Sequence, residues 1–238
     1  MTNLTYLAAF DTETTGIDVL NDRIVTASIV YLDGYDQIIS EHEWLIDPGI
    51  PIPDGAAEVH GITTIHAQTH GVEAPMAIWE IASTIAYFLS NGVPVVAYNA
   101  SYDFSILNAE CIRHLDYPFS RFFRGGIIPP RILDPMVIDK RVDRYRPGSR
   151  TLSAASQHYD VTLDNAHTSA ADSMAAAGVL RSIWERYEVL QEAPVDELYN
   201  EQILWYAEQQ TGLRNHFLSQ GSPEKAATVN TSWPIRTE

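Results

Sequence analysis

LTYLAAFDTETTG, residues 4–16, begins as an apolar run and ends with two carboxylates, Asp11 and Glu13, followed by turn residues. The apolar part predicts a buried strand. Because residues i and i+2 of a strand point to the same face, Asp11 and Glu13 are expected side by side at the strand end. Two like charges about 4 Å apart repel by roughly 4 kcal/mol at an effective dielectric of about 20. A bound divalent cation commonly offsets such repulsion, although the same residues also suit a plain polar junction between strand and turn.

Four further segments have the length and residue types of strands. Residues 23–32 and 37–46 flank the turn signal Asp33-Gly34, and with the first strand they are expected to form an antiparallel meander. Short apolar segments at 95–98 and 131–134 add two more strands. Helical spacing of apolar residues predicts helices over 75–91, 102–114, 151–159, 169–187 and 195–219. This order of elements indicates an α/β fold built on one mixed sheet.

The charge of the chain is unevenly distributed. A formal net charge of −16 over 238 residues argues, as a total, against nucleic acid as a partner. Eight of the 15 basic and three of the 31 acidic residues fall between positions 121 and 150, so this window carries +5 and the remainder −21. One basic stripe on an acidic protein suits local binding of a polyanion, although chance clustering in a solvated loop gives the same pattern. The basic stripe consists of Arg121, Arg124, Arg131, Lys140, Arg141, Arg144, Arg146 and Arg150.

The lack of a recognisable targeting signal and the single cysteine lead us to expect a cytoplasmic protein that does not enter a membrane. The N-terminal residues lack the basic region of a signal peptide, and no apolar run reaches the roughly 20 residues of a membrane span. Cys111 is the single cysteine, which excludes an internal disulfide and fits a reducing compartment. We expect one domain over residues 1–188, and a separate C-terminal part, 189–238, composed of a helix and a flexible tail.

Three residues at other element ends extend the acidic pair. Asp103 follows the strand at 95–98, on the edge where α/β sheets place their sites, although an acid at a helix N-terminus is also favourable without any function. His167 and Asp172 are five residues apart, which on a continuous helix would separate them by about 140°. They converge only if His167 lies in the loop before the helix. A loop His suits a general base, and an Asp on a first helical turn suits a metal ligand.

Together these residues form an oxygen-rich set of four carboxylates and one imidazole without a thiolate. Such ligands favour Mg²⁺ or Mn²⁺ over zinc. Two such ions about 4 Å apart stabilise the attacking and leaving oxygens of a phosphodiester displacement.

Three motifs make the chain resemble a known family. The segments FDTETTG (10–16), YNASYDF (98–104) and HTSAAD (167–172) have the order and spacing of the DEDDh 3′–5′ exonucleases, relatives of the proofreading subunit of bacterial replicative DNA polymerase, and EVHGIT (58–63) is also similar. The resemblance covers roughly residues 4–187. In one difference, the second motif commonly begins with His-Asn, whereas this chain has Tyr98-Asn99. The family fold implied is ribonuclease H-like, a five-stranded mixed sheet flanked by helices.

The resemblance also implies a role for each matching residue. Asp11 would bridge two divalent cations, Glu13 and Asp172 would complete one metal site, and Asp103 would hold the second ion directly or through water. His167 would accept a proton from the attacking water. The residues that match positions cradling the terminal nucleotides are Thr14, Thr15, His60, Gly61, Ile62 and Tyr102.

These features favour a two-metal 3′–5′ exonuclease that hydrolyses DNA from a single-stranded 3′ end and releases nucleoside 5′-monophosphates, in repair or in proofreading beside a DNA polymerase. The same chemistry on RNA is the alternative, because no sequence feature decides contact with the 2′-OH. A non-catalytic nucleic-acid-binding or polymerase-binding domain is disfavoured, because every expected ligand is present. We expect the basic stripe, and Arg144, Arg146 and Arg150 in particular, to line the path of the strand.

Overall fold

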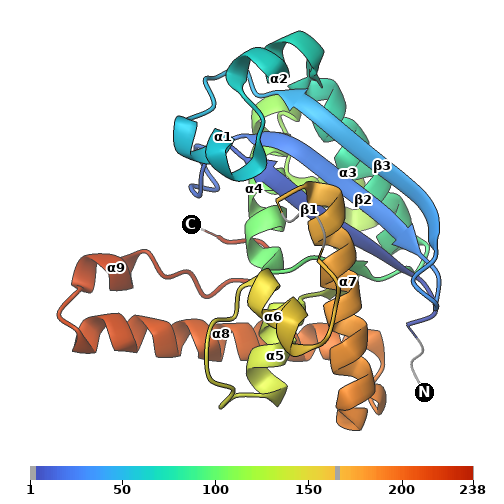
Figure 1. The fold of residues 1–238 in the computed structure, drawn as a ribbon, viewed down its shortest axis with the longest axis vertical. Coiled ribbons are helices and arrows are strands. Elements are labelled where there is room, and N and C mark those ends of the chain that lie inside the picture. Colours follow the sequence, from blue (N-terminus) through green and yellow to red (C-terminus); the bar gives the residue numbers. More distant parts are fainter. Residues whose placement is uncertain (1–3, 164–166, 238) are drawn as a thin grey trace.

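A mixed sheet forms the centre of the molecule (Figure 1). In the computed structural model, which describes residues 4–163 and 167–237, the sheet has six strands in the order β4-β3-β2-β1-β5-β6. The first three strands are antiparallel, and β5 and β6 run parallel to β1. The expected meander and mixed sheet are therefore confirmed. The strands are β1 (Leu7–Thr14), β2 (Ile24–Leu32), β3 (Ile38–Asp47), β4 (Val72–Glu73), β5 (Val95–Val96) and β6 (Ile132–Leu133).

The number of strands differs from the expected five. The additional strand, β4, has two residues and pairs in parallel with Ile46 and Asp47 at the end of β3. So short a segment carries no period-two pattern, and its strand conformation comes only from its neighbour.

Helices cover both faces of the sheet (Figure 1). All five expected helices are present, as α3, α4, α6, α7 and α8, with ends shifted by at most two residues. Shorter helices that the sequence did not indicate follow proline or cap residues in segments that resemble loops. The helices are α1 (Asp54–His60), α2 (Thr64–His70), α3 (Ala74–Ser90), α4 (Ala100–Leu115), α5 (Pro135–Val142), α6 (Leu152–His158), α7 (Ser169–Arg186), α8 (Val195–Ser219) and α9 (Pro223–Ala227).

The side chains of β1 divide the interior into two cores, because successive residues of a strand face opposite sides of the sheet. Ala8 and Phe10 pack in the core that contains α3 and α4. Leu7 and Ala9 pack in the core that contains α7. The same alternation of side chains continues to the end of β1. It directs Thr12 toward α4, and it directs Asp11 and Glu13 toward α7.

Close packing of α7 on the sheet rests on small side chains. Ala175 and Ser173 are buried, and the Ser173 hydroxyl lies 2.7 Å from that of Ser28 on β2. At Gly178 a Cβ atom would lie 2.9 Å from Val161 Cγ1, so only glycine lets the preceding loop cross the helix there. This approach brings the first turn of α7, which carries Asp172, to the end of β1.

The end of the C-terminal segment contacts the body of the protein, and that this tail is flexible stays a prediction. Figure 1 shows the far half of α8 extending away from the sheet with α9 beside it, after which the chain returns to the body. Trp233 is only 6% exposed and its ring lies 5.1 Å from that of Tyr199. The backbone N–H of Arg236 donates to Ser105 Oγ on α4 at 2.8 Å. The polar composition of the tail concealed this one apolar anchor. That residues 1–188 form a domain separate from 189–238 stays a prediction.

Among the described residues, no helix is both long enough and apolar enough to cross a membrane.

The packed tail can be tested by removing its anchor. We expect Trp233→Ala to lower the free energy of unfolding by about 3 kcal/mol or more, since it deletes a buried indole and leaves a cavity. Trp79, which is 52% exposed on α3, is the matched control, and Trp79→Ala should change stability little. Urea denaturation of both variants measures the difference, and equal effects would show that the tail is not anchored by Trp233.

Candidate active site

Four carboxylates from three elements meet at the end of β1. Asp11 and Glu13 lie on β1, Asp103 on the first turn of α4 and Asp172 on the first turn of α7. Burial raises the pKa of Asp11 well above its usual range, and the neighbouring charges of Asp103, Asp172 and Glu13 raise it further. The structure therefore brings together the four acids that the sequence singled out.

The same environment raises the pKa of the other three acids. Burial and the charge of Asp172 raise the pKa of Glu13 to about 7. Burial raises the pKa of Asp103 to about 7, against a hydrogen bond that Thr12 Oγ1 donates to Asp103 Oδ1 at 2.8 Å. The pKa of Asp172 is also raised by burial. Without a nearby positive charge, Glu13 and Asp103 are therefore about half-protonated near neutral pH.

The loop before α7 places His167 beside Asp172. His167 is exposed and lies in a turn, with φ of 71°, outside the helix as the spacing required. Its backbone N–H donates to Asp172 Oδ2 at 3.3 Å, and the Thr168 side chain caps the helix by accepting from Ala171 N. The backbone of the loop is thus tied to the helix, while the imidazole remains at the surface.

The donor set fits a divalent cation. One ligand atom each from Glu13, His167 and Asp172 lies within 4.8 Å of the others. Asp172 Oδ1 is buried and, within the described parts of the chain, has no hydrogen-bond partner. A buried acceptor without a partner costs about 1–3 kcal/mol, and a cation would remove that cost. Oxygen-rich donors of this kind select Mg²⁺ or Mn²⁺.

A pocket of about 390 Å³ adjoins the acids. Strands β2 and β3 form part of the pocket wall, because strand pairing places Thr26 beside Glu13 and Leu45 beside Thr26. Trp44 is held in place by a hydrogen bond from its Nε1 to Glu80 Oε2 at 2.9 Å. The pocket residues are Glu13, Thr26, Glu43, Trp44, Leu45, His60, Ile62, His167, Thr168 and Ser169. Sequence reasoning missed the four on β2 and β3, which belong to no motif. The sequence feature that could have indicated them is the expected antiparallel pairing of these strands with the strand that carries Glu13.

The EVHGIT segment supplies a fixed imidazole to this pocket. His60 Nδ1 accepts a hydrogen bond from Ile62 N at 3.1 Å, so the neutral ring carries its proton on Nε2. Burial lowers the pKa of His60, which favours that neutral form. Nε2 is buried and has no partner among the residues described, which leaves one N–H to offer. Gly61 ends α1 in the left-handed conformation, with φ of 78°, and so acts through its backbone.

The residues after Glu13 divide into two groups. The Tyr102 hydroxyl lies 2.5 Å from both Thr14 Oγ1 and the carbonyl oxygen of Gly16, which ties α4 to the loop after β1. Thr15 is 3% exposed and donates through Oγ1 to Asp22 Oδ1 at 2.9 Å. The side chain of Thr15 therefore closes the loop, and that this residue helps to cradle the terminal nucleotide stays a prediction.

Two arginines of the basic stripe are also used internally. Arg146 and Arg150 contact Asp139 Oδ2 at 2.7 and 2.6 Å, and the Tyr159 hydroxyl donates to Asp139 Oδ1 at 2.6 Å. Asp139 is fully buried, so its charge requires these partners. Arg146 and Arg150 are thus committed to Asp139, whereas Arg144 is exposed, and that these three arginines line a strand path stays a prediction.

Asp134 supports the site and was missed from the sequence. Its carboxylate accepts hydrogen bonds from the backbone N–H groups of Asn99, Ala100 and Met136, at 3.0, 2.9 and 2.9 Å, and is fully buried. It thereby holds the start of α4, where Asn99 has φ of 65° and provides no side-chain cap, as well as the start of α5. The dipeptide Asp134-Pro135, a cap residue before a first-turn proline, was the available signal.

Comparison with known proteins gives a family match and distant relatives. The model of a family described as "Exonuclease" (RNase_T) matches residues 8–180. The DNA polymerase III PolC-type of Streptococcus thermophilus is 26% identical over 225 residues, which cover 87% of this chain and 14% of the polymerase. The PolC-type enzyme of Lacticaseibacillus paracasei is 23% identical over 175 residues, 73% of this chain and 11% of the polymerase. The chain thus spans only a small fraction of these relatives.

Solved structures show the same fold. Escherichia coli Exonuclease I in complex with a dT13 oligonucleotide superposes with a TM-score of 0.61 at 18% identity, over 76% of this chain and 42% of that one. Exonuclease I from Methylocaldum szegediense gives a TM-score of 0.63 at 21% identity, over 88% of this chain and 45% of that one. At this level of identity the likeness extends to the fold alone.

The raised pKa values predict how stability depends on pH without metal. Glu13 and Asp103 have ordinary values of 4.5 and 3.8 and folded values of about 7, so the folded protein binds more protons than the unfolded chain between those limits. The free energy of unfolding in chelator should therefore fall as pH rises from about 5 to about 8. In the Asp11→Asn variant, the decrease in the free energy of unfolding over this pH range should be smaller by about 1 kcal/mol or more. The substitution removes one of the negative charges that repel each other in the site.

Urea denaturation across this pH range measures the effect. The exposed variant Glu201→Gln is the control and should keep the wild-type pH dependence. A stability that rises with pH in the wild type would contradict the arrangement of the four acids.

Proposed function

Because the chain belongs to the exonuclease family whose model matches residues 8–180, we propose that it is a 3′–5′ exonuclease that hydrolyses DNA and releases nucleoside 5′-monophosphates. The observation that carries the proposal is the convergence of Asp11, Glu13, Asp103 and Asp172 with His167 at one sheet edge. DNA is favoured over RNA because the relatives are named as DNA polymerases, and the related Exonuclease I was solved with an oligo-dT.

The acids would hold two divalent cations, Mg²⁺ or Mn²⁺. Asp11 would serve both ions, Glu13 and Asp172 would help to hold one of them, and Asp103 would help to hold the other directly or through water. The fit is supported by the unpartnered Asp172 Oδ1, within the described residues, and by the elevated pKa of Glu13 and Asp103. Bound ions of this kind polarise the phosphodiester and stabilise charge on the attacking and leaving oxygens.

His167 would act as the general base. Its imidazole accepts a proton from the water that attacks phosphorus, while the bond from phosphorus to the 3′ oxygen of the preceding nucleotide breaks. Support comes from its exposure in a turn and from its position within 4.8 Å of Glu13 and Asp172 ligand atoms. The adjacent pocket would receive the terminal nucleotide, with the His60 Nε2–H as a donor and Leu45 as an apolar wall.

A proofreading role is the biological setting that we propose. The matching segments of the PolC-type relatives lie within DNA polymerases, and a 3′–5′ exonuclease beside a polymerase acts on its newly made 3′ ends. Such a protein would work in the cytoplasm.

A degradation ladder tests substrate, polarity and metal together. Single-stranded DNA, duplexes with matched or mismatched 3′ ends, and RNA, each labelled at the 5′ end, are incubated with Mg²⁺, Mn²⁺ or chelator. The proposal predicts shortening from the 3′ end of DNA with either metal and none in chelator. Preferential loss of RNA would reassign the substrate, and digestion in chelator would contradict the metal assignment.

Asp11→Asn tests the metal assignment directly. We expect turnover to fall at least about 1000-fold, because metal ions contribute several kcal/mol of transition-state stabilisation and each 1.36 kcal/mol is tenfold in rate. Asp160→Asn is an isosteric control in an exposed turn and should retain wild-type activity. Circular dichroism checks that both variants fold, and residual activity above about 1% of wild type would refute the role of Asp11.

A further inference from the structure

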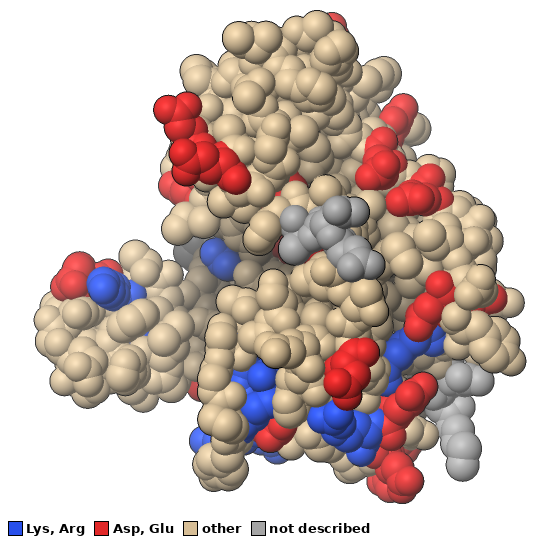
Figure 2. Space-filling model, in the orientation of Figure 1, with Lys and Arg blue, Asp and Glu red and all other residues tan. Residues whose placement is uncertain are grey.

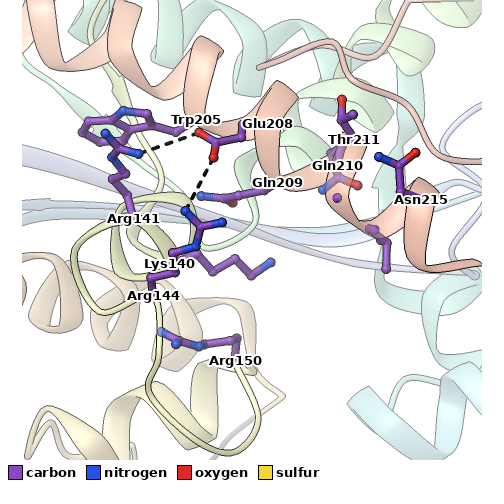
Figure 3. Close-up of a pocket in the computed structure, with 12 residues that line it drawn as sticks. Lys140, Arg141, Arg144, Arg150, Trp205, Glu208, Gln209, Gln210, Thr211 and Asn215 are labelled. Carbon is purple, nitrogen blue, oxygen red and sulfur yellow. Dashed lines mark ion pairs between the residues drawn. The ribbon is translucent and has the colours of Figure 1, made fainter.

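A groove with a volume of about 610 Å³ lies between α5 and α8 (Figure 3). Its α5 side carries Lys140, Arg141, Arg144 and Arg150, and α8 contributes amide side chains that include Gln210 and Asn215. Figure 3 shows the cationic side chains facing the α8 residues across the groove. Most of the basic side chains visible in Figure 2 lie in the lower half of the molecule, while acidic ones dominate elsewhere on that face.

Most of the positive charge in the groove is available to a ligand. Arg141 and Arg144 both contact Glu208 at 3.7 Å, and these are exposed pairs of the kind that contribute little. Lys140 is partly buried and, within the described ranges, makes no ion pair, and burial lowers its pKa. Only Arg150 is committed, to buried Asp139. Although the chain has a formal net charge of −16, the groove is locally rich in positive charge, which suits an anionic ligand.

The groove is joined to the acidic site through Asp134. That carboxylate holds the start of α4, which carries Asp103, and also the start of α5. Lys140 lies six residues beyond Asp134, about 9 Å along the helix at 1.5 Å per residue. Gln209 Nε2 donates to the Val137 carbonyl at 3.0 Å and fixes α8 against α5. The groove is thus rigidly attached to the acids but distinct from them.

An exposed aromatic residue follows the groove residue Arg144 in the chain. Tyr145 follows Arg144 in the loop between α5 and α6 and is 90% exposed. Arg150 donates to the carbonyls of Asp143 and Arg146, at 2.6 and 3.2 Å, which orders this loop. Exposed aromatic rings beside cations are the combination that proteins use to bind single-stranded nucleic acid by stacking and by phosphate contacts.

We propose that the α5–α8 groove binds the phosphodiester backbone of single-stranded DNA several nucleotides upstream of the 3′ end, with Tyr145 stacking on a base. This inference rests on the proposed function and extends it from the reacting end to the body of the strand. Lys140, Arg141 and Arg144 contact phosphates, and Glu208 competes with those phosphates for the two arginines.

Opposite charge changes at Lys140 and Glu208 test the proposal. Binding of a fluorescein-labelled 20-nucleotide oligo-dT is measured by anisotropy in chelator, with Asp11→Asn as the common background. Lys140→Ala should weaken binding at least 3-fold and reduce the slope of log K against log salt by about 0.7, the value for one phosphate contact on a single strand. Glu208→Gln should tighten binding at least 2-fold, and Tyr145→Ala should weaken it.

Lys225→Ala removes one positive charge from exposed α9 and is the matched control, with an expected change below 2-fold.

Two results would overturn the groove assignment: unchanged oligo-dT affinity in both groove variants, or weaker binding after Glu208→Gln. Failure of the proposed function is distinct, because it appears as absence of hydrolysis in the wild type, while the binding measurements need no turnover. Thermal melting of each variant verifies folding.

Discussion

The repulsion among four carboxylates at the end of β1 is the constraint around which this protein is built. Burial and mutual charge raise the pKa of Asp11, Glu13 and Asp103, so the folded chain alone does not stabilise them as anions. Rigid supports nevertheless hold them together. Thr12 binds Asp103, and the loop backbone at His167 binds Asp172. The remaining electrostatic cost makes the site receptive to cations, as the proposed metal-dependent activity requires.

Buried acids outside the site organise the surrounding chain in the same way. Asp134 caps α4 and α5 together, and Gln202 of α8 accepts from Asp134 N at 2.7 Å and donates to the Ile132 carbonyl at 3.2 Å. The edge strand β6 is therefore held from the side of α8. Asp139 binds Arg146 and Arg150, which orders the loop that presents Arg144 and Tyr145. The residues of the basic stripe are thus divided into two groups: some form buried ion pairs inside the protein, and others lie at the surface.

The C-terminal segment takes part in both cores. Val195 and Leu198 of α8 pack with the α7 side, and Tyr206 packs with the α4 side, where its hydroxyl lies 2.9 Å from Ser101 Oγ. Trp233 adds to the latter core after the chain has turned back through α9. These contacts link α8 to the helix that carries Asp103, so the segment supports the acidic site from behind while its far half contributes one wall of the α5–α8 groove.

The sequence by itself determined the parts of this protein that depend on local periodicity and on short motifs. The alternation along residues 7–14 put Asp11 and Glu13 on one face, and the spacing of His167 and Asp172 required a loop followed by a helix, as the structure has it. Only the tertiary structure decided which side chains surround these residues. Leu45 reaches the pocket through the register of β3 on β2, Asp139 takes two arginines from the basic stripe, and Trp233 anchors the tail. Strand register and buried ion pairs join residues far apart in the chain, so they leave no periodic signal in the sequence around any one of them.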